Sequence, residues 1–179
     1  MKILLLFIPL LFLFSCQDRE KRLFLEELDA LTSKLDSMET VARENGIDTL
    51  NVLIEYIKTN TKEVANHYYT DTVDYEIANM MNTYKETRKA FAKNSGNLAK
   101  ARQAIPEVKE SIANLSHDIH HGVGERDKYE EFVAFERGKV TQIKEILTYY
   151  METKDKYTAL FIETDQQVLD FIEQLKREN

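Results

Sequence analysis

Apolar residues recur along most of this chain of 179 residues in alternating steps of three and four. That spacing keeps them on one face of an α-helix and is typical of helices packed in a bundle or coiled coil. Residues that interrupt helices are scarce, with five glycines and two prolines. We therefore expect an all-α fold: an elongated helical bundle of four to five helices, with coiled-coil-like packing and a very long C-terminal helix.

The pattern divides into five segments. It predicts helices at about 18–44, 48–68, 72–94, 97–121 and 125–177. The apolar stripe changes phase near Thr70, which indicates either a break or a local irregularity there. Pro106 leaves the phase of its stripe unchanged, so we expect a kinked helix at that position rather than two helices.

Turn and cap residues mark the expected boundaries. We expect Asn45-Gly46 to end the first helix in a left-handed conformation, and Asn94-Ser95-Gly96 to form a turn. Asp48-Thr49 and Asp71-Thr72 have the chemistry of helix N-caps, and Asp127 with Glu130 has the spacing of a capping box.

The fifth segment carries one apolar stripe from Tyr129 to Leu175. A continuous helix of about 50 residues is about 75 Å long, twice the length expected for the other helices. Part of its stripe therefore needs cover from a second copy, from another protein, or from the helix folding back at 151–156. The candidate partner-interface residues are Phe161, Val168, Phe171 and Leu175.

The chain opens with Met1-Lys2, a short apolar run and Ser15, which are the parts of a secretory signal. The run is too short for a transmembrane helix, which needs about 20 apolar residues, and Pro9 interrupts it. The single cysteine, Cys16, stands where this run meets a charged segment. An ordinary cleaved signal with an incidental cysteine, or a buried thiol, is the alternative reading.

Leu13-Phe14-Ser15-Cys16 resembles the lipobox of bacterial lipoproteins. The resemblance implies a signal peptide at 1–15, an acylated Cys16 in a short tether at 16–22, and a single helical domain at 23–179. It also implies a lipid-anchored protein of the cell envelope, at the outer membrane, facing the periplasm or the medium. The following residues "QDRE" resemble the export signal of surface lipoproteins in Bacteroidota, or form a solvated linker.

The charge balance limits the partners. The chain has a net charge of −7, and loss of Lys2 with the signal changes it to −8. An acidic chain repels nucleic-acid phosphates, so we expect no nucleic-acid partner.

The segment "SHDIHHG" is the best candidate for binding chemistry. His117 and His121 are four residues apart and so share a helix face, as two metal ligands do, and Asp118 is a candidate third ligand. A metal or small-ligand site at His117, His120 and His121 is the second functional candidate. The alternative is a polar last turn, in which histidines favour the helix dipole and Gly122 ends the helix.

Residues 115–136 resemble a segment of uncharacterised helical lipoproteins of Bacteroidota, with Gly122 at a helix end and Glu136 on the apolar stripe. Glu136 then needs a buried partner or an exposed edge. Three triplets, beginning at Asp36, Asp48 and Asp71, resemble the O-glycosylation site of exported Bacteroidota proteins. They give Ser37, Thr49 and Thr72 as candidates, with helix capping as the alternative for the last two.

No pattern of a nucleophilic, metal-dependent or phosphate-binding enzyme is present in the sequence. We therefore expect no enzymatic activity and no cofactor. The sequence indicates a membrane-anchored envelope lipoprotein with a structural or protein-interaction role, which contacts another protein or forms a homodimer through its long helices.

Overall fold

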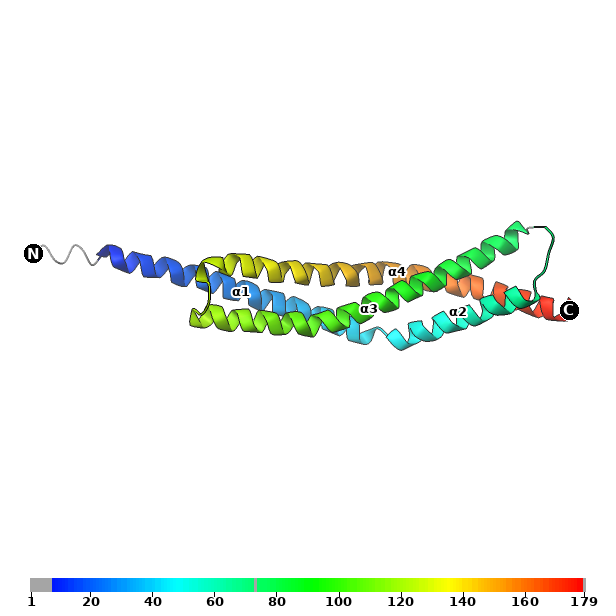
Figure 1. Ribbon diagram of the computed structural model, residues 1–179, viewed down its shortest axis with the longest axis horizontal. Helices are drawn as coiled ribbons and strands as arrows, with labels where there is room; N and C mark the ends of the chain where they lie inside the picture. Colours follow the sequence, from blue (N-terminus) through cyan, green and yellow to red (C-terminus); the bar gives the residue numbers. More distant parts are fainter. Residues whose placement is uncertain (1–7, 73, 179) are drawn as a thin grey trace, which may run out of the picture. The chain divides into compact units, whose positions relative to one another are not determined.

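A computed structural model describes residues 8–72 and 74–178, with side chains from residue 19 onward, Val73 aside. It contains four α-helices: α1 (Ile8–Glu44), α2 (Ile47–His67), α3 (Tyr75–His121) and α4 (Tyr129–Glu178) (Figure 1). A short 3₁₀ helix, η2 (Arg126–Lys128), precedes α4, and the described residues contain no strand. The predicted all-α bundle with a long C-terminal helix is confirmed.

The helices form two compact units. Unit 1 comprises the described part of Met1–Val41 together with Gln103–Lys144, and so contains α1 apart from its last turn, the second part of α3 and the first part of α4. Unit 2 comprises the described part of Ala42–Arg102 and Glu145–Asn179, and so contains α2, the first part of α3 and the remainder of α4. Each unit therefore packs three helical segments.

The apolar stripes of the sequence form the cores of both units. In unit 1 the buried side chains include Leu28, Leu35, Ile105, Ile112, Ile119, Val133 and Val140. In unit 2 they include Ile57, Val64, Tyr84, Phe91, Leu98, Tyr150 and Val168. Burial of each large side chain stabilises the fold by about 1.5–3 kcal/mol before its entropy cost.

The expected turn at Asn94-Ser95-Gly96 is wrong, because α3 runs through it as one helix of 47 residues. Phe91 and Leu98 are buried on either side of this point. The amide oxygen of Asn94, which is 1 % exposed, accepts a hydrogen bond from Thr153 of α4 at 2.9 Å. These contacts within unit 2 outweigh the weak helix preference of the three residues. Helix α3 also continues through Pro106, as predicted.

Helix α4 is continuous over 50 residues and does not break at 151–156. Contacts from this segment explain its order. The Thr153 hydroxyl donates to Asn94, and the Lys154 ammonium donates to the side-chain oxygen of Asn45 at 2.8 Å. The preferred sequence interpretation, a single long C-terminal helix, is confirmed.

The end of α1 differs from the expectation. Gly46 has a φ of −75° and so is not left-handed. The guanidinium of Arg102 on α3 donates instead to the carbonyl oxygens of Ala42, Arg43 and Asn45. A side chain from another helix thus supplies the donors that a left-handed glycine cap supplies through the backbone.

The helix N-termini also differ from the expectation. Helix α2 begins at Ile47 behind Gly46, without a side-chain cap, so Asp48-Thr49 lie in its first turn. The cap of α3 is Asp74, whose carboxylate accepts from the backbone N–H groups of Glu76 and Ile77 at 2.9 and 3.1 Å. Asp71-Thr72 remain in the loop, and η2 occupies the position of the expected capping box before α4.

Candidate functional site

The predicted lipidation site lies at the margin of the described chain. Residues 1–7 are outside it, and so is the side chain of Cys16, although the backbone of Cys16 belongs to α1. None of the described helices is long and apolar enough to cross a membrane. Acylation of Cys16 stays a prediction.

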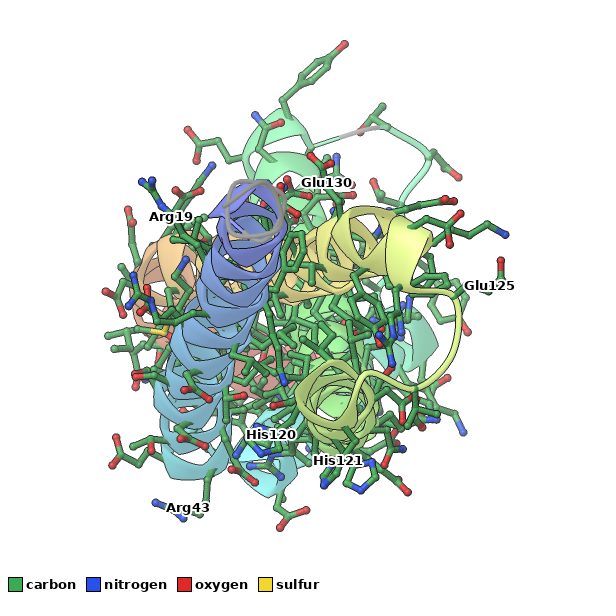
Figure 2. All side chains as sticks on the ribbon, turned by 90° about the vertical axis from the view of Figure 1, so that its left-hand side faces the viewer. Arg19, Arg43, His120, His121, Glu125 and Glu130 are labelled. Atoms are coloured by element: carbon green, nitrogen blue, oxygen red, sulfur yellow. The ribbon has the colours of Figure 1, made fainter. Side chains whose placement is uncertain are left out.

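The histidines predicted as metal ligands lie in the last turns of α3, exposed to solvent. Figure 2 shows His120 and His121 together on the outer side of that helix. The rings of His117 and His121 are 4.2 Å apart between centroids, and the Nδ1 of His121 is 2.8 Å from the carbonyl oxygen of His117. The Asp118 carboxylate is 3.5 Å from the Nδ1 of His117.

This arrangement does not support the predicted metal site. The described residues contain no group of three or more His, Cys, Asp or Glu side chains that is able to hold a metal ion. His121 uses Nδ1 for a backbone contact, so only its Nε2 remains for a ligand. The polar last turn, which was the alternative, describes these residues better.

The end of α3 has the geometry expected for Gly122, which has a φ of +65°. The N–H of Gly122 donates to the carbonyl of Ile119, and the N–H of Val123 donates to the carbonyl of Asp118. This pair of bonds is a Schellman motif. The Tyr129 hydroxyl lies 3.1 Å from the carbonyl oxygen of Asp118 and 2.7 Å from that of Val123, so α4 holds the turn in place.

An open pocket of about 640 Å³ lies beside this turn in unit 1. Its apolar lining includes Phe24, Ile119 and Tyr129. Its charged lining consists of Glu20 and Lys21 from α1, and Arg126 and Asp127 from η2, with His121 beside them. No sequence pattern indicated this pocket, because its charged residues come from segments about 100 positions apart.

Glu136 is buried in unit 1 with 5 % exposure. One carboxylate oxygen accepts from the Ser111 hydroxyl at 2.7 Å and from the Lys139 ammonium at 2.8 Å. The other oxygen, Oε2, has no hydrogen-bond partner among the described residues. The prediction that Glu136 needs a buried partner is therefore confirmed for one oxygen only.

The four residues predicted as a partner interface lie in unit 2 and pack against their own chain. Val168 and Leu175 are 0 % and 6 % exposed. The ring of Phe161 lies within 6.3 Å of the rings of Tyr56, Tyr84 and Phe91, and the ring of Phe171 lies 5.4 Å from that of Tyr68. Helices α2 and α3 cover this part of the stripe, which removes the reason for expecting a partner there.

A partly buried polar network accompanies these rings. The Tyr84 hydroxyl donates to one oxygen of the Asp165 carboxylate at 2.6 Å, and the Tyr56 hydroxyl donates to the other oxygen at 3.2 Å. Asn60 donates to the Tyr84 hydroxyl at 3.1 Å. Burial, together with the bond to Asp165, raises the pKa of Tyr84 far above its usual range. The network joins α2, α3 and α4 within unit 2.

The three candidate glycosylation sites have different surroundings. Ser37 lies in α1 and donates to the carbonyl of Ser33, and Thr49 lies in the first turn of α2. Thr72 lies in the exposed loop between α2 and α3. Thr72 is thus the only one of the three outside a helix.

Comparison of the chain with protein-family models, with curated proteins and with solved structures finds no significant match.

Proposed function

We propose that this protein is a lipid-anchored lipoprotein of the cell envelope that acts through contact with another macromolecule rather than by catalysis. The observation that carries the proposal is the lipobox-like Leu13-Phe14-Ser15-Cys16 at the end of a short apolar run. A signal of that form ends at a cysteine that receives acyl chains, and several chains give stable anchoring.

The architecture is consistent with this role. Both units are bundles of helices whose apolar stripes are largely buried in their own cores. The described residues contain no three-ligand metal site, and the clusters of polar side chains that they do contain join helices to one another. Such helical units suit a spacer or scaffold held at a membrane.

We place the contact with a protein partner on exposed apolar side chains rather than on the buried stripe of α4. Phe135 is 65 % exposed on α4, and Tyr69 and Tyr75 are 83 % and 79 % exposed at the ends of the α2–α3 loop. Exposed aromatic side chains are frequent anchors in protein interfaces. A second copy of the chain and a different protein are both compatible with such anchors.

Metabolic labelling with an alkyne fatty acid, followed by membrane fractionation, tests the anchor. We expect label in the wild-type protein and none in Cys16→Ser, which should leave the membrane fraction. Labelling that persists in Cys16→Ser, or a wild-type protein without label, contradicts the anchor.

Photo-crosslinking tests the contact. A photoreactive phenylalanine at position 135, 69 or 75 should give a discrete crosslinked product in cells, while the same group at the half-buried position 161 should give none. The crosslinked mass distinguishes a second copy from another protein. Products from position 161 alone would contradict the placement.

A further inference from the structure

The pocket of about 640 Å³ at the end of unit 1 has a size typical of ligand sites, which range over about 300–1,000 Å³. Its lining combines two cationic side chains, Lys21 and Arg126, with two anionic ones, Glu20 and Asp127. None of the four forms an ion pair with another side chain in the part of the chain that the structure describes. The pocket therefore presents both signs of charge to a ligand that carries both.

Backbone contacts fix the two cations in place. The Lys21 ammonium donates to the carbonyl oxygen of His120 at 2.5 Å, and the Nε of Arg126 donates to that of Gly122 at 2.6 Å. These bonds use one donor of each side chain. Two N–H groups of Lys21 and four of Arg126 remain, and a guanidinium fork matches the oxygens of a phosphate.

The pocket also lies close to the proposed anchor. Glu20 and Lys21 follow Cys16 by four and five residues, and all three belong to α1. At about 1.5 Å per residue, they lie at most about 6 and 7.5 Å from Cys16 along the helix. The headgroup layer on each side of a bilayer is about 5–7 Å thick. This step rests on the proposed acylation of Cys16, which would bring the pocket to the level of the lipid headgroups.

We propose that this pocket binds the headgroup of a phospholipid with a phosphoethanolamine headgroup. The phosphate lies at Lys21 and Arg126, and the primary ammonium, which has three N–H donors, lies at the carboxylates of Glu20 and Asp127. A chain with a net charge of −7 is repelled by a net anionic surface, but a zwitterionic headgroup has no net charge to repel it. Binding would hold unit 1 against the membrane beside the anchor.

Native mass spectrometry of the processed protein in maltoside tests the proposal, with lipids that share acyl chains and differ only in the headgroup. We expect one phosphatidylethanolamine per chain, at an occupancy about tenfold above that of phosphatidylcholine or phosphatidylglycerol, because each charged hydrogen bond is worth about a factor of ten. Equal binding of the three lipids, or preference for phosphatidylglycerol, would overturn the proposal.

Matched variants assign the binding to the pocket. Lys21→Gln should lower the phosphatidylethanolamine occupancy about tenfold, whereas Arg22→Gln should leave it unchanged, since Arg22 is exposed, adjacent and paired with Glu26 outside the pocket. The Asp127 carboxylate accepts no hydrogen bond from the described residues, so Asp127→Asn should also lower the occupancy without disturbing the helix end. An equal loss of occupancy in Lys21→Gln and Arg22→Gln would show that binding depends only on surface charge, and would contradict binding in the pocket.

Two further readouts separate the possible failures. Soluble phosphoethanolamine should compete poorly with the lipid, and competition at equal concentration would overturn the membrane source of the ligand. The intact mass of the same preparation reports whether Cys16 carries acyl chains. Acylation without headgroup selectivity overturns the pocket alone, and selectivity without acylation overturns the anchor alone.

Discussion

The guanidinium of Arg102 on α3 donates to the backbone carbonyl of Asn45 at 2.8 Å, 57 positions earlier in the chain. It also reaches the carbonyl of Ala42 at 2.9 Å and so ends α1 from outside that helix. The side-chain oxygen of Asn45 accepts in turn from Tyr150 and Lys154 of α4. These bonds join the α1–α2 junction to both long helices of unit 2.

Loss of the Arg102 side chain should therefore destabilise the fold. We expect Arg102→Ala to lower the free energy of unfolding by about 1–3 kcal/mol, because three carbonyl oxygens lose a charged donor. Arg102→Lys should restore part of this, since an ammonium is a single point charge without the fork. Urea denaturation measures both, with Lys100→Ala, an exposed cation on the same helix, as the control. A urea midpoint of Arg102→Ala equal to that of the wild type would contradict a stabilising role of Arg102 at the end of α1.

The Tyr84–Asp165 pair should make unit 2 sensitive to alkaline pH. Burial and Asp165 raise the pKa of Tyr84 above its unfolded value of about 10, so the folded state holds the proton more tightly. Its contribution is fully present below pH 10 and is lost as the pH rises above 10. The urea midpoint of the wild type should fall more between pH 8 and pH 11 than that of Tyr84→Phe.

At neutral pH, Tyr84→Phe should cost about 1–3 kcal/mol, because Asp165 loses its shortest donor. Tyr69→Phe, at a side chain that is 83 % exposed, is the matched control and should stay within about 0.5 kcal/mol of the wild type. Equal effects of the two substitutions would show that the network adds nothing to stability.

Replacement of the buried Glu136, unlike that of Arg102 or Tyr84, should leave stability unchanged or raise it. A buried carboxylate with one unpaired oxygen is costly, and an apolar side chain of similar volume is often neutral or stabilising. We expect Glu136→Met to change the unfolding free energy by about 0 to +2 kcal/mol. Ser111→Ala should lower it by about 1 kcal/mol, because the carboxylate then loses a donor. Thermal denaturation of both variants measures these changes. A marked loss of stability in Glu136→Met would show that the bonds to Lys139 and Ser111 are worth more than burial of the carboxylate costs.

Gly96 should be replaceable with a gain in stability. It lies inside α3, has no positive φ, and a Cβ added there meets nothing within 4 Å. Gly96→Ala should raise the unfolding free energy by about 0.5–1 kcal/mol. Gly122→Ala should lower it by about 1–2 kcal/mol, since its φ is +65° and a Cβ would lie 2.7 Å from Arg126. Destabilisation by Gly96→Ala would contradict a continuous α3.

If the protein is O-glycosylated, the exposed loop determines the site. A modifying enzyme needs access to the backbone around its target, which a helix restricts and a loop permits. We expect glycan at Thr72 and none at Ser37 or Thr49, whose residues are helical. Peptide mapping of the native protein checks this, and Thr72→Ala should remove the mass increment. Glycan at Ser37 would contradict the dependence on the loop.

The sequence by itself determined the class of the fold. The helix period, the continuity through Pro106 and the end of α3 at Gly122 follow from local signals. Each signal is local: the spacing of apolar residues is set from one turn to the next, the stripe keeps its phase across the proline, and the glycine follows directly after the last turn. Near Thr70 the sequence left a break and a local irregularity open, and the structure has a break, since α2 ends at His67 and α3 begins at Tyr75. The stripe favoured one long α4, and the contacts of Thr153 with Asn94 and of Lys154 with Asn45 decided against a break at 151–156.

Only the tertiary structure decided how the helices end and what covers them. Gly46 is not left-handed because Arg102 supplies the cap, and Asn94-Ser95-Gly96 is helical because Thr153, 59 positions away, bonds to Asn94. The stripe at Phe161 and Val168 is covered because α2 and the first part of α3 pack against it within unit 2. Each of these outcomes depends on contacts between residues far apart in the sequence, which together outweigh local preferences of up to about 1 kcal/mol per residue.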